Sequence, residues 1–179
     1  KSDGNKQTNF KFKTEIPYLF KTPIGINFDI NIFKQDSTFQ NTNLNYNVGY
    51  FFNYNTRAYI GVKNNTSVYT APTNSFYKNF EAKFYTLNFI KEFIDPQSIL
   101  FKRKGSIDIK FGTGNRIAEN KNNQLFLKTE VDYNFSLNQK NYIYIKNATY
   151  YLKSDEYLIN ELYRIGGTNS LRGFNENSL

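Results

Sequence analysis

The chain has 179 residues, of which 23 are Lys or Arg and 15 are Asp or Glu, giving a formal net charge of +8. It contains no Cys and no His, which excludes disulfides, thiol chemistry, imidazole-based catalysis and nearly all transition-metal sites. The positive residues are spread singly along the chain, and the one tight cluster, 102–104, adjoins a predicted turn, so we expect no nucleic-acid partner.

No apolar run approaches the length of about 20 residues that a transmembrane helix needs, and the start of the chain lacks the organisation of a signal peptide. A membrane-spanning β-barrel stays compatible with a chain that is hydrophilic on average. In its strands only every second residue faces lipid, so they show alternation and no long apolar run. The absence of Met and an end inside a predicted loop predict an internal segment of a longer protein.

Alternation of apolar and polar residues with a period of two recurs almost from end to end, and it predicts about eight strands. The clearest case is 24–32, where every even position is apolar and the odd positions are Gly, Asn, Asp and Asn. In chain order the predicted strands cover approximately 8–20, 24–32, 44–52, 56–68, 76–93, 98–113, 125–137 and 140–153.

Turn-rich segments separate these strands and predict an antiparallel up-and-down meander. They lie at 21–23, 53–55, 70–74, 95–97, 115–123 and 138–140. Residues 89–94 are also compatible with one turn of helix, and we predict a strand end there. The sequence Gly112-Thr113-Gly114 lacks the helix and Lys that follow a phosphate loop, so it predicts a strand end or turn.

Alternation does not say which face meets water, because a soluble β-sandwich turns its apolar residues inward and a membrane barrel turns them outward. Long strands, an uninterrupted meander and aromatic residues at strand ends favour the transmembrane barrel over the sandwich. The aromatic residues at these ends are Tyr18, Phe20, Tyr50, Phe51, Phe52, Tyr69, Tyr150 and Tyr151.

Charged residues on the polar face predict charged rows that line a wet lumen. We place the carboxylates of Asp29, Glu81, Asp108, Glu130 and Asp132 there, alternating with Lys83, Lys110 and Lys128. Paired acids of this kind can also do general acid/base work. Because they alternate with Lys, we expect a structural role, no catalytic residue, no metal site and no cofactor.

The last stretch of the chain carries the most specific pattern. A Gly-Gly turn at Gly166 and Gly167 is followed by a short polar step and then by an aliphatic-Arg-Gly-aromatic run, Leu171, Arg172, Gly173 and Phe174. Residues 163–174 resemble the sixth extracellular loop of the Omp85 family (BamA/TamA, surface antigen) of outer-membrane barrels. Leu171 stands where that family often has Val. The alternative is an ordinary glycine-containing turn with a solvated Arg.

The resemblance implies that the loop folds back into the lumen and that Arg172 reaches an acidic residue on a later strand. Gly166 and Gly167 would form the turn into the loop, Gly173 would allow a tight backbone, and Phe174 would contact the wall. Residues 1–155 would supply about eight strands of a sixteen-strand barrel, the fourth to the eleventh, and 156–179 would begin the loop.

The resemblance also implies a location in the bacterial cell outer membrane and a role in inserting or translocating other proteins. The expected partners are outer-membrane lipid, client outer-membrane or surface proteins and accessory lipoproteins, and the chain is not expected to be an enzyme. Two alternatives stay open. The barrel could anchor or export a fused enzymatic domain, or it could be a passive porin-like channel.

Overall fold

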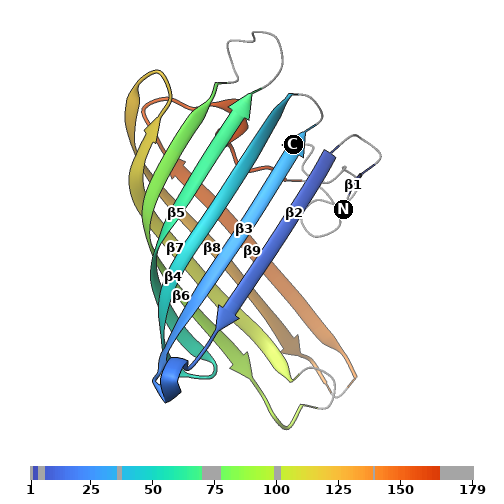
Figure 1. Cartoon of the computed structure of the whole chain (residues 1–179). Coiled ribbons are helices and arrows are strands. Elements are labelled where there is room, and N and C mark those ends of the chain that lie inside the picture. Colours follow the sequence, from blue (N-terminus) through green and yellow to red (C-terminus); the bar gives the residue numbers. More distant parts are fainter. Residues whose placement is uncertain are drawn as a thin grey trace.

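A computed structural model of the chain describes residues 2–3, 7–35, 38–69, 78–98, 102–138 and 140–165. In this part of the chain, nine strands form one sheet in sequence order, each antiparallel to the next (Figure 1). The strands are β1 (Ser2–Asp3), β2 (Gln7–Ile16), β3 (Ile24–Gln35), β4 (Phe39–Asn53), β5 (Thr56–Tyr69), β6 (Phe80–Ile94), β7 (Arg103–Ile117), β8 (Lys121–Ser136) and β9 (Tyr142–Lys153). The predicted all-β, up-and-down order of eight long strands is confirmed.

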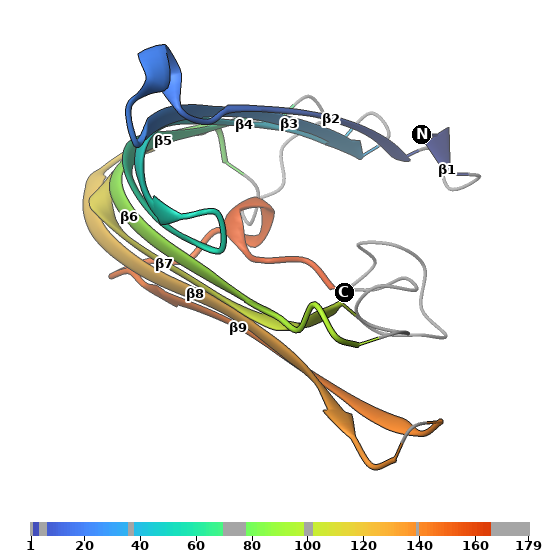
Figure 2. The ribbon, with the colours of Figure 1, turned by 90° about the horizontal axis from the view of Figure 1, so that it is seen from below.

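Helical structure in the described residues is limited to two short 3-10 turns, η1 (Leu19–Lys21) and η2 (Ile159–Glu161). The sheet is not closed, since β1 and β9 are the first and last strands of the order and neither β1 nor β2 pairs with β9. Figure 2 shows the sheet curling into a trough, with η2 and the residues after it inside the curve. The sheet therefore has a convex face and a concave face.

Several predicted boundaries shift in the structure. β2 ends at Ile16, four residues early, because Pro17 follows and Tyr18 and Phe20 adopt left-handed backbone angles with φ of 53° and 52°. Residues 89–94 belong to β6, which confirms the predicted strand end.

The turn after β6 is held by Asp95, whose carboxylate accepts hydrogen bonds from Lys104 at 2.7 Å and from the Gln97 backbone N–H at 3.1 Å. These bonds hold the pKa of Asp95 below its usual range.

The predicted turn at 115–123 is much shorter than expected. β7 runs to Ile117 and β8 starts at Lys121, so the connection is 118–120. Asn-rich sequence predicted a turn, but Asn115 pairs with Asn123 in the ladder and Arg116 is buried on the concave face. The Gly112-Thr113-Gly114 sequence also lies inside β7, where the prediction of a strand end or turn was wrong.

The convex face carries the apolar side chains. Most of the exposed large hydrophobic residues of the strands share this face in the register of the sheet, from the first long strand to the last. Examples are Phe10, Phe12, Ile26, Tyr46, Val48, Ile60, Tyr85, Leu87, Ile109, Val131, Ile143 and Ile145. Burial is therefore inverted relative to a soluble sheet of this curvature, which would turn such residues inward.

The concave face is mostly polar. Asn47 donates a hydrogen bond to Asn27 at 3.0 Å, and Lys110 donates one across the trough to Asn45 at 3.0 Å. The ring of Tyr59 lies over Gly49, and its hydroxyl reaches Glu15 on β2 at 2.6 Å. Some of the amide, ammonium, hydroxyl and carboxylate groups of the trough thus bond to one another.

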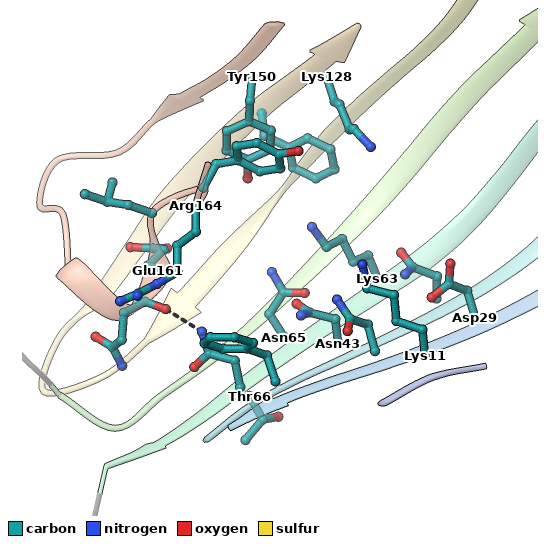
Figure 3. Close-up of a pocket in the computed structure, with 18 of the residues that line it drawn as sticks. Lys11, Asp29, Asn43, Lys63, Asn65, Thr66, Lys128, Tyr150, Glu161 and Arg164 are labelled. Carbon is teal, nitrogen blue, oxygen red and sulfur yellow. Dashed lines mark hydrogen bonds between the residues drawn. The ribbon is translucent and has the colours of Figure 1, made fainter. Parts of the chain in front are cut away.

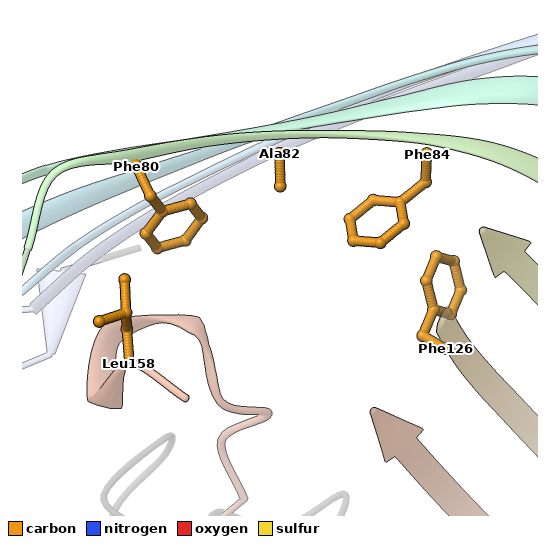
Figure 4. Close-up of a cluster of buried hydrophobic side chains, with 5 residues drawn as sticks. All are labelled: Phe80, Ala82, Phe84, Phe126 and Leu158. Carbon is orange, nitrogen blue, oxygen red and sulfur yellow. The ribbon is translucent and has the colours of Figure 1, made fainter. Parts of the chain in front are cut away.

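The first half of β6 reverses this polarity. Phe80, Ala82 and Phe84 face the concave side, where they form a buried cluster with Phe126 and Leu158 (Figure 4). Glu81 and Lys83 are exposed and alternate with them, so they lie on the convex face. Their predicted place on the polar, lumen-facing side was therefore wrong. The register of β6 places Tyr85 and Leu87 outward, and this fixes the direction of the earlier residues.

Gly112 is needed where the sheet and this cluster meet. It lies opposite Phe126 in the ladder, and a Cβ at this position would overlap the Phe126 ring. We expect Gly112→Val to push Phe126 out of the cluster and to lower the free energy of unfolding by about 1–3 kcal/mol, the usual cost of overpacking. Urea unfolding followed by circular dichroism measures this change.

Thr113→Val is the matched control, because Thr113 is exposed on the opposite face. It should change the stability by less than about 0.5 kcal/mol. An equal effect of the two substitutions would show that the contact between Gly112 and Phe126 is not the cause.

Candidate functional site

After β9 the chain turns back over the concave face. Residues 154–165, here called the strap, include η2 and lie inside the curve of the sheet (Figure 2). The strap begins at Ser154, whose hydroxyl donates to the Glu156 carbonyl at 2.6 Å. Its side chains then contact strands on both sides of the trough.

Asn160 fixes the strap to β4 and β5. It is fully buried, with an exposed fraction of 0%. Its Nδ2 donates to Ser67 Oγ at 2.7 Å and to the Lys78 carbonyl at 2.9 Å. The backbone carbonyl of Asn160 accepts a hydrogen bond from Asn41 Nδ2 at 2.6 Å, and Ser67 Oγ donates one to Asn41 Oδ1 at 2.5 Å. The strap backbone therefore takes part in a continuous hydrogen-bond network with the wall.

Glu161 fixes the strap to β7 and β8. Its Oε2 lies 2.7 Å from Nη1 of Arg116, and the exposed fractions of the two side chains are only 6% and 1%. Its other oxygen, Oε1, accepts from Gln124 Nε2 at 2.5 Å. The Asn122 amide, turned so that its oxygen faces the guanidinium, accepts from Nη2 at 2.7 Å. A buried charge pair of this kind is stable only because further hydrogen bonds surround it.

Apolar and aromatic contacts complete the docking. Leu158 belongs to the buried cluster and lies on the Phe80 side of it, while Phe126 lies against Phe84 (Figure 4). Tyr163 stacks on Tyr150 of β9, with ring centroids 5.1 Å apart and planes at 24°. The guanidinium carbon of Arg164 lies 4.9 Å from the ring centroid of Phe39, close enough for a cation–π interaction.

Between the strap and the sheet lies a cavity of about 380 Å³ (Figure 3). Its lining combines Lys and Asn side chains from the wall with strap residues and the aromatic rings of Phe126 and Tyr150. A second, smaller hollow of about 200 Å³ follows along the concave face, lined by residues such as Lys13, Glu15 and Asp108. The described residues contain no group of three or more acidic side chains able to hold a metal ion.

Of the five carboxylates predicted to line the lumen, four lie on the concave face and Glu81 lies on the convex face. Asp29, Asp108, Glu130 and Asp132 lie on the concave face, and Asp29 and Asp108 line the two hollows. Glu130 is paired with Lys128 at 2.8 Å, and Asp132 with Arg103 at 2.9 Å. Asp108 and Glu130 are directly opposite each other in the ladder, next to the opposed pair Lys110 and Lys128, so the acids stand in charged rows with Lys neighbours.

The motif residues Gly166, Gly167, Leu171, Arg172, Gly173 and Phe174 lie outside the described residues, and their predicted roles stay predictions.

The sequence analysis did not single out Arg116, Asn160 or Glu161, which hold the strap. One signal was available for Arg116, because it continues the alternation of Gly112 and Gly114 on one face. Two small residues beside a long cation indicate a site where another segment approaches the sheet.

In the described ranges, no helix is both long enough and apolar enough to cross a membrane. Comparisons with protein-family models, with curated proteins and with solved structures found no match to the chain.

Proposed function

We propose that the chain is part of the wall of a transmembrane β-barrel in a bacterial outer membrane, and that the barrel inserts or exports other proteins. The observation that carries this proposal is the inverted polarity of the sheet. Its convex face exposes large apolar residues, and its concave face holds the Asn, Lys and carboxylate groups. Lipid outside and water inside is the environment that suits both faces.

The open edges support a barrel larger than the strands described. The outer edge of β9 has no strand partner among the described residues, and β2 has only the two-residue β1 beyond it. Unpaired backbone groups are too costly to lie in hydrocarbon. Further strands that close the sheet would satisfy them, in keeping with the sixteen-strand barrel that the resemblance implies.

The role in protein insertion or translocation rests on the resemblance and on the strap. In the Omp85 family the loop that carries the motif folds into the lumen. Here the strap, which directly precedes Gly166, lies against the concave face through Asn160 and Glu161. Arg172 would then continue a segment that already lies inside the wall.

Replacing Arg172 in the full-length protein tests this role. We expect Arg172→Ala to lower barrel stability by about 1.5–3 kcal/mol, the usual value of a hydrogen bond to a charged group, and to reduce client insertion at unchanged expression. Arg172→Lys should restore only part of the function, because an ammonium lacks the planar fork of a guanidinium. Heat-modifiability on gels and the outer-membrane level of client barrels are the measurements.

Lys140→Ala is the control, since it removes one cation from the exposed turn between β8 and β9. Normal client insertion and unchanged heat-modifiability in Arg172→Ala would contradict the proposal that the barrel inserts or exports other proteins.

A passive channel is the second candidate, favoured by the polar cavity under the strap. It predicts steady ion conductance from the purified protein and no defect in client assembly for Arg172→Ala.

A further inference from the structure

Several Lys side chains on the concave face lie close together, where their positive charges repel one another. Lys110 of β7 and Lys128 of β8 are directly opposite in the ladder, and like charges in this arrangement are destabilising. Lys63 of β5 lies close enough for the charges of both to act on it. Three ammonium groups therefore converge on one part of the trough.

Carboxylates compensate this charge only in part. Lys128 is paired with Glu130 at 2.8 Å. Among the described residues, the ion pairs within 4.0 Å include neither Lys63 nor Lys110. Lys110 donates to the neutral amide of Asn45 at 3.0 Å. The ammonium of Lys63 lies 4.8 Å from the ring centroid of Phe126.

These cations border the cavity under the strap. Figure 3 shows Lys11, Lys63 and Lys128 around the same space, with Asp29 beside them. Cationic side chains in the lining outnumber carboxylates, and of the two carboxylates Glu161 is already bound to Arg116. The cavity therefore has a positive potential that favours an anion.

The rest of the lining fits hydroxyl groups and a ring. The side-chain oxygens of Asn31 and Asn65 are buried and accept no hydrogen bond from any described residue. Both residues line the cavity, as do the aromatic rings of Phe126 and Tyr150. Amide oxygens accept from sugar hydroxyls, aromatic rings offer a flat apolar surface, and ammonium groups bind phosphate.

We propose that this cavity binds a small phosphorylated sugar, with Lys63 and Lys110 on the phosphate and Asn65 on a hydroxyl. The proposal goes beyond the proposed function, because it needs a water-accessible cavity and no client protein. Loss of client insertion in Arg172→Ala and loss of sugar phosphate binding are therefore separate results.

Calorimetric titration of the full-length protein in detergent with glucose 6-phosphate tests the proposal. We expect binding to the unaltered protein, displacement by inorganic phosphate, and no detectable binding of glucose. Lys63→Gln and Lys110→Gln should each weaken the affinity about tenfold, as expected for loss of a hydrogen bond to a charged group. Asn65→Ala should weaken glucose 6-phosphate binding and leave the affinity for inorganic phosphate unchanged.

The Gln variants relieve repulsion among the Lys residues and so should fold, which circular dichroism checks. Lys140→Gln is the matched control, because it removes the same charge in an exposed turn. No binding of glucose 6-phosphate, equally tight binding of glucose, or an equal loss in Lys140→Gln would each overturn the proposal.

Discussion

Glu161→Ala should release the strap and lower the free energy of unfolding by about 3–5 kcal/mol, because it leaves a buried guanidinium without its nearest carboxylate, and the exposed Glu156 lies 3.8 Å away. The exposed fraction of the Arg116 side chain is 1%, and Glu161 Oε2 lies 2.7 Å from its Nη1. Gln124 would also lose the acceptor of its 2.5 Å hydrogen bond. Unfolding in urea, followed by circular dichroism, measures the stability, and limited proteolysis measures release of the strap.

Two variants make this experiment specific. Glu119→Ala breaks the ion pair with Lys78, whose N–O distance is also 2.7 Å. The exposed fraction of Glu119 is 73%, so this change should cost no more than about 1 kcal/mol. In the double variant Arg116→Met with Glu161→Leu, both charges are absent, and most of the stability should return. If Glu161→Ala costs no more than Glu119→Ala, the buried pair does not hold the strap.

Ile60→Lys should prevent stable insertion into a lipid bilayer, with a cost of about 2–4 kcal/mol if the residue lies near the midplane. Ile60 belongs to β5, and 63% of its surface is exposed on the convex face. An ammonium there would have to lie in hydrocarbon under the proposed function. The measurement is the yield of folded barrel in lipid vesicles together with its urea stability.

Ala148→Lys is the matched control for this substitution. Ala148 lies on β9, is exposed on the concave face and is opposite Glu130 in the ladder, so a further ammonium there stays hydrated and faces a carboxylate. It should therefore insert normally. Normal insertion of Ile60→Lys, or a purified protein that stays in solution without detergent, would contradict a lipid-facing convex surface.

The strand pattern could be predicted from the sequence because period-two alternation is a local property. In β3 the apolar even positions and polar odd positions specify a strand without any tertiary information. Alternation separates two faces but does not state which of them faces inward. At Phe80, Ala82 and Phe84 the apolar face is concave because Phe126 of β8 and Leu158 of the strap, both distant in the sequence, cover it.

The strap could not be predicted in the same way. Asn160 and Glu161 belong to a single 3-10 turn with no period, and their partners lie on strands far away in the sequence. Arg116 was assigned to a turn because of its Asn-rich neighbours, yet its guanidinium is the buried partner of Glu161. Contacts between distant segments of this kind leave no local signal in one sequence.

Consecutive residues of the strap bind different parts of the curved sheet. Asn160 is held by β4 and β5, and Glu161 by β7 and β8. The separation between these strand pairs is thereby limited to the distance that one peptide unit and two side chains can span. The strap therefore acts as a cross-tie that sets the radius of curvature. Its departure would allow the trough to flatten and widen, so that the presence of the strap in the interior and the width of the trough change together.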